Sequence, residues 1–146
     1  MFLPDVNLWL ALILSGHTHH GAARAWLDGV NTPGSVSFCR ATQQALLRLL
    51  TTAAVFTPYG NAALTNREAW SVYAKLRKDD RIVFAEESAG LEAIWKSLAA
   101  GDAPSPKLWM DAYLAALAID GNMRLVTFDR GFVPFCRKGL DLFLIP

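Results

Sequence analysis

The sequence is poor in cysteine, with only Cys39 and Cys136 among its 146 residues. They form no C-x-x-C motif and no zinc-binding pattern, and two cysteines are too few for the disulfide framework of small secreted domains. This scarcity excludes the disulfide-scaffold and zinc-finger classes. It favours a protein that works in the reducing cytoplasm.

Charged residues are also scarce. They make up 18% of the chain, and the formal net charge is only +1, so no strong basic field marks a nucleic-acid-binding surface. Any phosphate binding must be local, through a metal ion or a few arginines. Arg40, Arg48 and Arg130 are candidates for contacting phosphate, and each could equally neutralise nearby acidic groups.

Long apolar runs are absent as well. The apolar stretch 6–14 is too short to span a bilayer, and the N-terminus lacks the positive region and the small-x-small cleavage site of a signal peptide. We therefore expect no membrane association. The stretch is interpreted as a buried helix that follows a short strand.

Apolar side chains are abundant, at 53% of the chain. In 146 residues without a linker or repeat, they suffice for the core of a single domain over residues 1–146. The apolar surplus also predicts a surface covered in a homodimer or by a protein partner.

Strand-like and helix-like segments alternate along the chain. We predict a three-layer α/β/α fold with a mostly parallel central β-sheet. A capping box at Thr65-x-x-Glu68 marks one helix start, Thr18 is expected to cap another helix, and 57–61 is expected to be a loop. The predicted strands are 2–3, 36–38, 82–85, 124–128 and 142–145, and the predicted helices include 6–14, 18–27, 41–50, 91–98 and 107–119.

No nucleotide-binding loop, zinc-protease motif or serine-hydrolase motif is present, so the search for chemistry reduces to the 13 acidic residues. Most of these lie at element ends or on wet helix faces. Asp5 and Asp129 each follow a predicted strand, at the sheet edge where active sites of open α/β sheets form. Either residue alone could simply cap a helix. Glu86 and Glu87 follow a third strand and are weaker candidates.

Asp111 interrupts the apolar run 108–117 and is therefore predicted to be buried. A buried carboxylate costs several kcal/mol unless it is paired, protonated or bound to a cation. A buried Asp111 that pairs with an arginine would have a purely structural role. If Asp5, Asp111 and Asp129 converge, they repel one another unless a cation lies among them. Oxygen ligands favour Mg²⁺ or Mn²⁺ over zinc, and phosphodiester hydrolysis is the natural chemistry of such a site.

Three ordered motifs around these aspartates resemble the signature blocks of PIN-domain ribonucleases. Segments between them are similar to VapC toxins of bacterial VapBC toxin–antitoxin systems. The three motifs are Leu3-Pro4-Asp5-Val6-Asn7, Leu108-Trp109-x-Asp111-Ala112-Tyr113-Leu114-Ala115-Ala116 and Leu125-Val126-Thr127-x-Asp129-Arg130-x-Phe132. The intervening segments are His17-x-x-His20-x-x-Ala23-x-x-Trp26 and Thr42-x-x-x-Leu46-Leu47-Arg48.

The resemblance implies an Mg²⁺-dependent endoribonuclease that cuts a cellular RNA. It also implies a cognate VapB-like antitoxin whose C-terminal segment enters the active-site groove. Asp5, Asp111 and Asp129 would be the catalytic and metal-binding residues. The Thr127 hydroxyl would steady Asp129. Asn7 would form a hydrogen bond near Asp5, or would have only the ordinary role of a residue in the first turn of a helix.

One position departs from the family pattern, because Ala45 stands where PIN domains usually carry a second acidic residue. Gln43, Gln44, another carboxylate or additional water could compensate, since Mg²⁺ keeps several waters. The departure also motivates a second hypothesis, a PIN-fold module that binds RNA or protein with weak or lost nuclease activity. A third, a phosphohydrolase with an Asp5 nucleophile, is disfavoured because Asn7 breaks the usual Asp-x-Asp pair.

The histidines are clustered, and the chain is rich in tryptophan. His17, His19 and His20 are expected to begin the second helix rather than to bind metal. Tryptophans could stack on RNA bases, but they mostly recur at core-facing helical spacing. Roles in the core or in a protein interface are therefore favoured for Trp9, Trp26, Trp70, Trp95 and Trp109.

Overall fold

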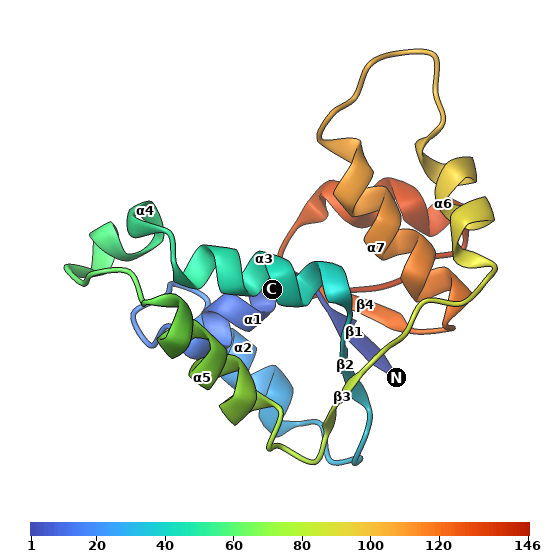
Figure 1. Cartoon of the computed structure of the whole chain (residues 1–146). Helices are drawn as coiled ribbons and strands as arrows, with labels where there is room; N and C mark the ends of the chain where they lie inside the picture. Colours follow the sequence, from blue (N-terminus) through green and yellow to red (C-terminus); the bar gives the residue numbers. More distant parts are fainter.

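The computed structural model describes the whole chain, residues 1–146, around a five-stranded sheet in which every pairing is parallel. The strand order is β3-β2-β1-β4-β5 (Figure 1). The strands are β1 (Phe2–Pro4), β2 (Val36–Phe38), β3 (Ile82–Phe84), β4 (Arg124–Thr127) and β5 (Asp141–Leu144). The predicted fold class is confirmed.

The strand order reverses beside β1. The chain adds β2 and β3 on one side of β1 and then returns to place β4 and β5 on the other side. In open parallel sheets, such a switch point leaves a crevice at the carboxyl ends of the two strands that flank it. Here those strands are β1, which Asp5 follows, and β4, which Asp129 follows closely.

Strand β1 is paired unequally with its two neighbours. It pairs with β4 at three positions but with β2 only at Phe2, opposite Val36. Pro4, at its end, has no N–H to donate. The next residue returns to the ladder, because the Asp5 backbone N–H donates to the Val126 carbonyl at 2.9 Å. Asp5 is thereby held against β4.

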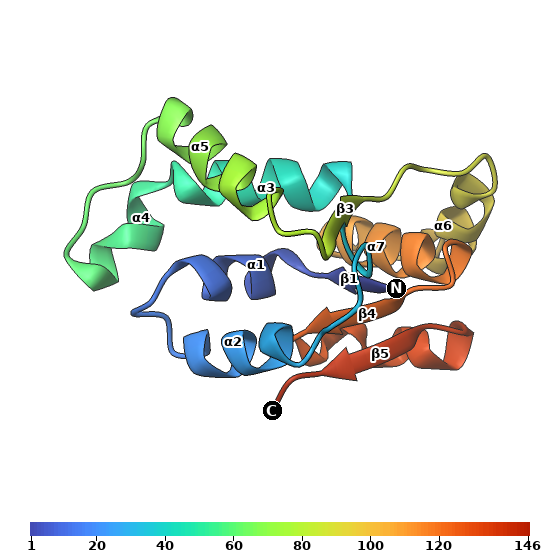
Figure 2. The same cartoon turned by 90° about the horizontal axis from the view of Figure 1, so that it is seen from below.

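One face of the sheet is covered by the helices that connect the first three strands (Figures 1 and 2). Their core includes the Trp9 and Phe38 rings, which stack with centroids 3.8 Å apart. The capping box of Thr65 and Glu68 forms as predicted. These elements are α1 (Val6–Ile13), α2 (His20–Asp28), α3 (Arg40–Leu50), α4 (Ala53–Phe56), the 3₁₀ helix η1 (Thr57–Tyr59) and α5 (Asn66–Leu76).

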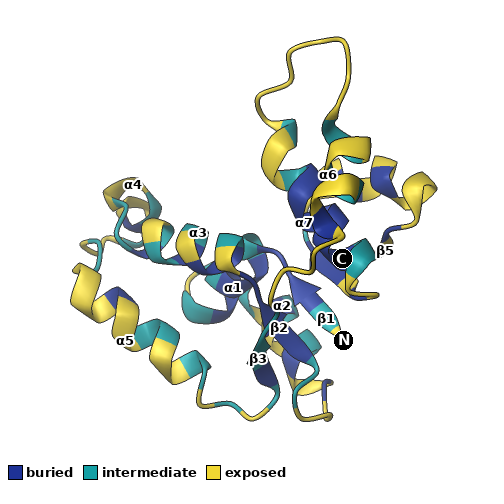
Figure 3. Cartoon of the chain, turned by 45° about the vertical axis from the view of Figure 1, so that its right-hand side comes forward, coloured by how far each residue is buried: buried dark blue, intermediate teal, exposed yellow.

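The other face carries a second apolar core. Leu3 and Leu125 point from the sheet into it, and the apolar side of α7 supplies most of the rest. Figure 3 shows the buried residues of α7 beneath a largely exposed α6. The elements of this layer are α6 (Leu91–Ala99), α7 (Leu108–Asp120) and the 3₁₀ helix η2 (Arg130–Lys138). None of the helices has the length and apolarity that crossing a membrane would require.

Several local predictions were wrong. Helix α2 begins after His19, without a side-chain cap, so Thr18 does not cap it. The expected loop 57–61 contains η1, and α4 precedes it. The side chain of Trp70 is 54% exposed, because α5 buries Ala69 and packs Val72 and Tyr73 against the core. Trp70 is one position away from that helical stripe.

Candidate active site

Asp5 is the most buried acidic residue of the chain, with 8% of its surface exposed. It caps the N-terminus of α1, where its Oδ1 accepts the Val6 backbone N–H at 2.6 Å. Its Oδ2 accepts the hydroxyl of Thr127 at 3.0 Å. Asp5 therefore does cap a helix, as the sequence allowed, but the cap uses only one of its two carboxylate oxygens.

The Thr127 hydroxyl joins the two strands at the switch point. Thr127 is fully buried, and its Oγ1 accepts the Asn7 Nδ2 at 2.9 Å and the Asp129 backbone N–H at 3.0 Å while donating to Asp5. One donor and two acceptor positions use the full capacity of a hydroxyl. Thr127 thus steadies Asp129 and also orients Asp5, whereas Asn7 reaches Asp5 only through it.

Asp129 follows β4 and lies at the start of η2. Its Oδ1 accepts the Gly131 backbone N–H at 2.7 Å, and the residue is exposed to solvent. Asp129 therefore also combines a capping bond with a free oxygen. A ligand could reach that oxygen without any rearrangement of the core.

The predicted burial of Asp111 was wrong. Asp111 lies in the first turn of α7 and is only partly buried, and the two preceding side chains, Trp109 and Met110, are exposed. The cause is the loop between α6 and α7, which projects away from the body instead of covering this turn (Figure 1). No arginine pairs with Asp111.

The three aspartates share one electrostatic environment. The pKa of Asp5 is raised from 3.8 to about 6, mainly by burial. The hydrogen bonds from the Val6 N–H and Thr127 oppose this rise, and repulsion by Asp111 and Asp129 adds to it. Burial and repulsion by Asp129 also raise the pKa of Asp111. The fold therefore concentrates negative charge at the switch point. The side chains do not form a closed cage, since no group of three His, Cys, Asp or Glu is close enough to hold a metal.

No additional carboxylate takes the place of the acid missing at Ala45. Only Asp111 and Asp129 add to the charge acting on Asp5. The Gln43 amide oxygen accepts Nη1 of Arg40 at 2.5 Å, and Gln44 is exposed in a hollow that Arg40 also lines. Neither Gln43 nor Gln44 forms a hydrogen bond with the three aspartates, so neither takes the place of the missing acid.

Arg40 and the histidines form no ion pair with the three aspartates. The Arg40 guanidinium lies over the Phe84 ring, 4.7 Å from its centroid, and does not neutralise the aspartates. His20 begins α2, as predicted, and its Nδ1 lies 2.7 Å from the Ala11 carbonyl oxygen. The His19 ring stacks on Phe128, just before Asp129.

One polar atom beside the site has no partner. Asn7 donates through Nδ2 to Thr127, while its Oδ1 is buried without a hydrogen bond. A buried acceptor without a partner is costly and calls for an explanation such as a bound water or ion. Together with the clustered carboxylates, this oxygen fits a hard cation with its water shell.

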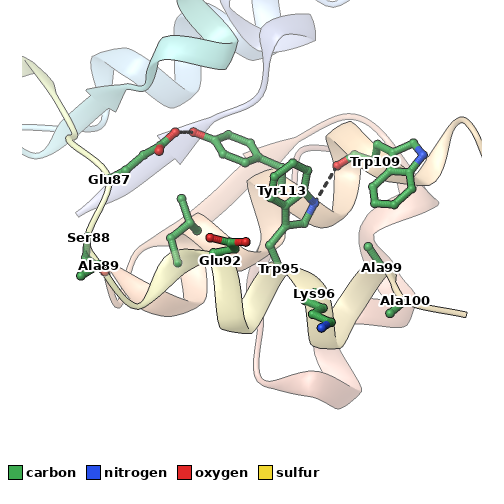
Figure 4. Close-up of a pocket in the computed structure, with 11 residues that line it drawn as sticks. Glu87, Ser88, Ala89, Glu92, Trp95, Lys96, Ala99, Ala100, Trp109 and Tyr113 are labelled. Carbon is green, nitrogen blue, oxygen red and sulfur yellow. Dashed lines mark hydrogen bonds between the residues drawn. The ribbon is translucent and has the colours of Figure 1, made fainter.

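Sequence reasoning missed the contacts of Glu87 and Trp109. The Tyr113 hydroxyl donates to Glu87 Oε1 at 2.6 Å, and Trp95 Nε1 donates to the Trp109 carbonyl at 3.1 Å (Figure 4). These bonds join the segment after β3 and helix α6 to the helix that carries Asp111. The sequence indicated only that Glu87 is an acidic residue that follows a strand. It gave no sign that Glu87 contacts Tyr113.

Comparisons with known proteins identify the family of the chain. The PIN domain family model matches residues 2–138. Ribonuclease VapC41 of Mycobacterium tuberculosis is 56% identical over 146 residues, covering 99% of both chains. Ribonuclease VapC44 of the same organism is 31% identical over 128 residues, covering 88% of this chain and 85% of the relative.

Solved structures share the fold at low sequence identity. The crystal structure of M. tuberculosis VapC20, described as a sarcin–ricin loop cleaving toxin, aligns with a TM-score of 0.64 at 21% identity, covering 92% of this chain and 94% of that chain. FitAcB from Neisseria gonorrhoeae aligns with a TM-score of 0.65 at 19% identity, covering 98% and 96%. With these matches, the chain belongs to the PIN-domain family, among the VapC ribonucleases.

Proposed function

We propose that the protein is an Mg²⁺-dependent endoribonuclease, the toxin of a type II toxin–antitoxin system that hydrolyses phosphodiester bonds in a cellular RNA. The observation that carries the proposal is the convergence of Asp5, Asp111 and Asp129 at the switch point, where burial and, to a smaller extent, repulsion by the other two carboxylates raise the pKa of Asp5. The 56% identity to a VapC ribonuclease along 99% of both chains supports the same function.

The residues at the site fit a divalent cation. Asp5, Asp111 and Asp129 would hold Mg²⁺, or Mn²⁺, with the unpaired Asn7 Oδ1 available to a water of its shell. All these ligands are oxygens, as both ions prefer. When bound, such an ion lowers the pKa of water and stabilises the charge that develops on a phosphodiester being cleaved.

The residues of the chain position and orient the groups that act. The Val6 N–H and the Thr127 hydroxyl fix both oxygens of Asp5, so the carboxylate cannot rotate freely. Asp129 is fixed through one oxygen and through its backbone N–H. This fixed geometry lowers the cost of reorganisation when charge develops in the transition state.

The partners and setting of the protein are part of the proposal. We infer a cognate VapB-like antitoxin, an RNA substrate, a homodimer and a cytoplasmic location for a single PIN domain over residues 1–146. Trp70 on α5 is exposed in the single chain, which supports a surface that a second subunit or the antitoxin covers. The two cysteines form no disulfide, which fits a reducing compartment.

A binding module with weak or lost nuclease activity is the second candidate. Ala45 supplies no carboxylate, and the three aspartates do not form a closed cage. A protein of this kind would bind RNA and leave it intact across a titration with Mg²⁺ or Mn²⁺.

Replacing Asp111 or Asp129 by asparagine tests the site. Each variant is expected to lower Mg²⁺-dependent cleavage of a labelled bacterial RNA pool by about 10²-fold or more, because a charge that stabilises the transition state is lost. Both side chains are at least partly exposed, so the variants should fold, and thermal melting checks this. Asp102→Asn, in the exposed α6–α7 loop, is the matched control. Wild-type cleavage by both site variants would contradict the assignment.

A further inference from the structure

Helix α3 carries a line of polar side chains on its exposed side. Arg40, Gln44 and Arg48 are four residues apart in turn, so they lie on successive turns of the helix, and all three are exposed. The eight residues from Arg40 to Arg48 correspond to about 12 Å along the helix axis. We call these three residues the α3 stripe.

No acidic residue neutralises the arginines of the α3 stripe. Arg40 and Arg48 form no ion pair, and the sequence of α3, RATQQALLRLL, contains no aspartate or glutamate. Ala45 thus keeps this helix free of negative charge. The sequence left open whether Arg40 and Arg48 contact phosphate or neutralise nearby acidic groups. Their lack of an acidic partner favours the contact with phosphate.

Both guanidinium groups have free N–H donors. Arg40 donates through Nη1 to the Gln43 amide oxygen and lies over the Phe84 ring, which holds the side chain in place while its other N–H groups stay free. Arg48 accepts hydrogen bonds from the Thr51 and Thr52 hydroxyls, but only through its backbone carbonyl. A free guanidinium can bind two oxygens of one phosphate at once.

The α3 stripe starts at the sheet edge that carries the carboxylates. Strands β1 and β2 are parallel neighbours with Phe2 opposite Val36, so the residues that follow them, Asp5 and Cys39-Arg40, lie at the same edge. From this edge, α1 and α3 run side by side in the same direction (Figures 1 and 2). A strand of RNA that reaches the edge can therefore continue along α3.

We propose that the α3 stripe binds the phosphate backbone of the RNA that the carboxylate site cuts; this inference rests on the proposed function. Arg40 and Arg48 bind phosphates, and the Gln44 amide donates to an oxygen of the backbone between them. The net charge of the chain is only +1, so this local positive charge supplies an attraction that the molecule as a whole lacks. Such contacts position the RNA without reading its sequence.

The chemistry of the α3 stripe favours an RNA backbone over a protein. Protein interfaces have an apolar core, but α3 exposes no large apolar side chain. Trp109 and Trp70, which border the two ends of the stripe, belong to α7 and α5. A second copy of the chain that docked through the same stripe would also bring arginines against arginines.

The test is the salt dependence of RNA binding in EDTA, measured by fluorescence anisotropy with labelled uridine and adenosine 12-mers. For single strands, log K changes with log salt by about 0.7 per phosphate contact. Arg40→Gln and Arg48→Gln are each expected to reduce this slope by about 0.7 and to weaken binding about fivefold at about 0.1 M salt, equally for both sequences. The double variant should lose about 25-fold.

A matched control is Arg137→Gln. Arg137 is another exposed arginine without an ion pair, and it lies near the end of η2, just before β5 begins at the opposite edge of the sheet. Its replacement should leave Kd and the salt slope unchanged. Gln44→Glu, by contrast, places a negative charge within the α3 stripe and should weaken binding about as much as the loss of one arginine.

Thermal melting verifies that the variants fold. Arg40 also contacts Phe84 and Gln43, so a fall in the melting temperature of Arg40→Gln would leave the decision to Arg48→Gln, whose side chain forms no hydrogen bond. Arg48→Lys keeps the charge and should retain most of the salt slope. A merely structural role for Arg48 would not change that slope at all.

Unchanged salt slopes for Arg48→Gln and Gln44→Glu, or an equal loss of binding in Arg137→Gln, would overturn the proposal. So would an Arg48→Gln protein that binds RNA normally but escapes inhibition by its antitoxin, because the α3 stripe would then be a protein-docking surface. With Mg²⁺ present, Arg48→Gln should raise KM and leave kcat unchanged. Wild type that binds RNA through the stripe but cuts none would contradict only the proposed function.

Discussion

Replacing Asp5 by asparagine is expected to lower RNA cleavage by about 10³-fold and, at the same time, to make the metal-free protein more stable at pH 8. The loss of cleavage follows from the loss of the buried negative charge beside Asp111 and Asp129. The gain in stability has the same origin, because the fold holds this carboxylate where its charged form is disfavoured, at a pKa of about 6 instead of 3.8.

The pH dependence gives this prediction its sign. Asp5 has a higher pKa in the folded protein than in the unfolded chain, so the folded protein binds more protons between pH 4 and 6. The favourable contribution of neutral Asp5 is complete below pH 4 and is lost as the pH rises through 6. A shift of this size corresponds to about 3 kcal/mol, to order of magnitude. An asparagine side chain cannot ionise, so the Asp5→Asn variant lacks this loss.

Urea unfolding of wild type and Asp5→Asn at pH 5 and pH 8, in EDTA, measures the difference. Comparing the two proteins cancels other groups, including Asp111, whose pKa is also raised, and His17, whose pKa is lowered mainly by burial and also by the neighbouring histidines. Mg²⁺ should then stabilise wild type at pH 8 and have little effect on the variant. An identical pH dependence in the two proteins would show that Asp5 does not carry the shift.

Replacing Thr127 by valine is expected to destabilise the protein by about 2–5 kcal/mol and to lower cleavage strongly. Valine has nearly the same shape, so the effect comes from the hydroxyl. Its removal leaves Asp5 Oδ2, Asn7 Nδ2 and the Asp129 N–H without the partner that the fully buried Thr127 provides. It also removes a bond that lowers the pKa of Asp5, so that pKa rises further.

Thr127→Ser is the matched control, since it keeps the hydroxyl and removes only a methyl group. Its stability is expected to stay within about 1.5 kcal/mol of wild type, and most of the cleavage should return. Urea unfolding and the cleavage assay measure both effects. If the valine variant were as stable and as active as the serine variant, the Thr127 hydroxyl would contribute to neither stability nor cleavage.

The sequence predicted the parts of the fold that depend on local chemistry. The alternation of strands and helices indicated the layers, and Thr65 and Glu68 marked a helix start through hydrogen bonds between near neighbours. The prediction that Thr18 caps a helix was wrong, because α2 begins only after His19. A capping residue also has to enter the helix in an extended conformation. Helix α4 has only four residues, too few for an apolar period to be visible.

The candidate site was predictable only in part. Asp5 and Asp129 could be found because residues that follow parallel strands meet at one edge. The prediction that Asp111 is buried was wrong. A loop such as 100–107 can cover a helix turn or project away from it, and an apolar sequence pattern does not distinguish the two cases. The Trp95–Trp109 contact joins residues 14 positions apart, which no local period encodes.

The proposed ligands come from two different layers of the molecule. Asp5 begins a helix of one apolar core, whereas Asp111 belongs to α7, whose apolar side forms the other core on the opposite face of the sheet. A partial opening that lifts α7 from the sheet would therefore separate the carboxylates while the rest of the fold stays intact. Cleavage should consequently be lost at lower urea concentrations than global structure, and hydrogen exchange in α7 should track activity more closely than exchange in α1.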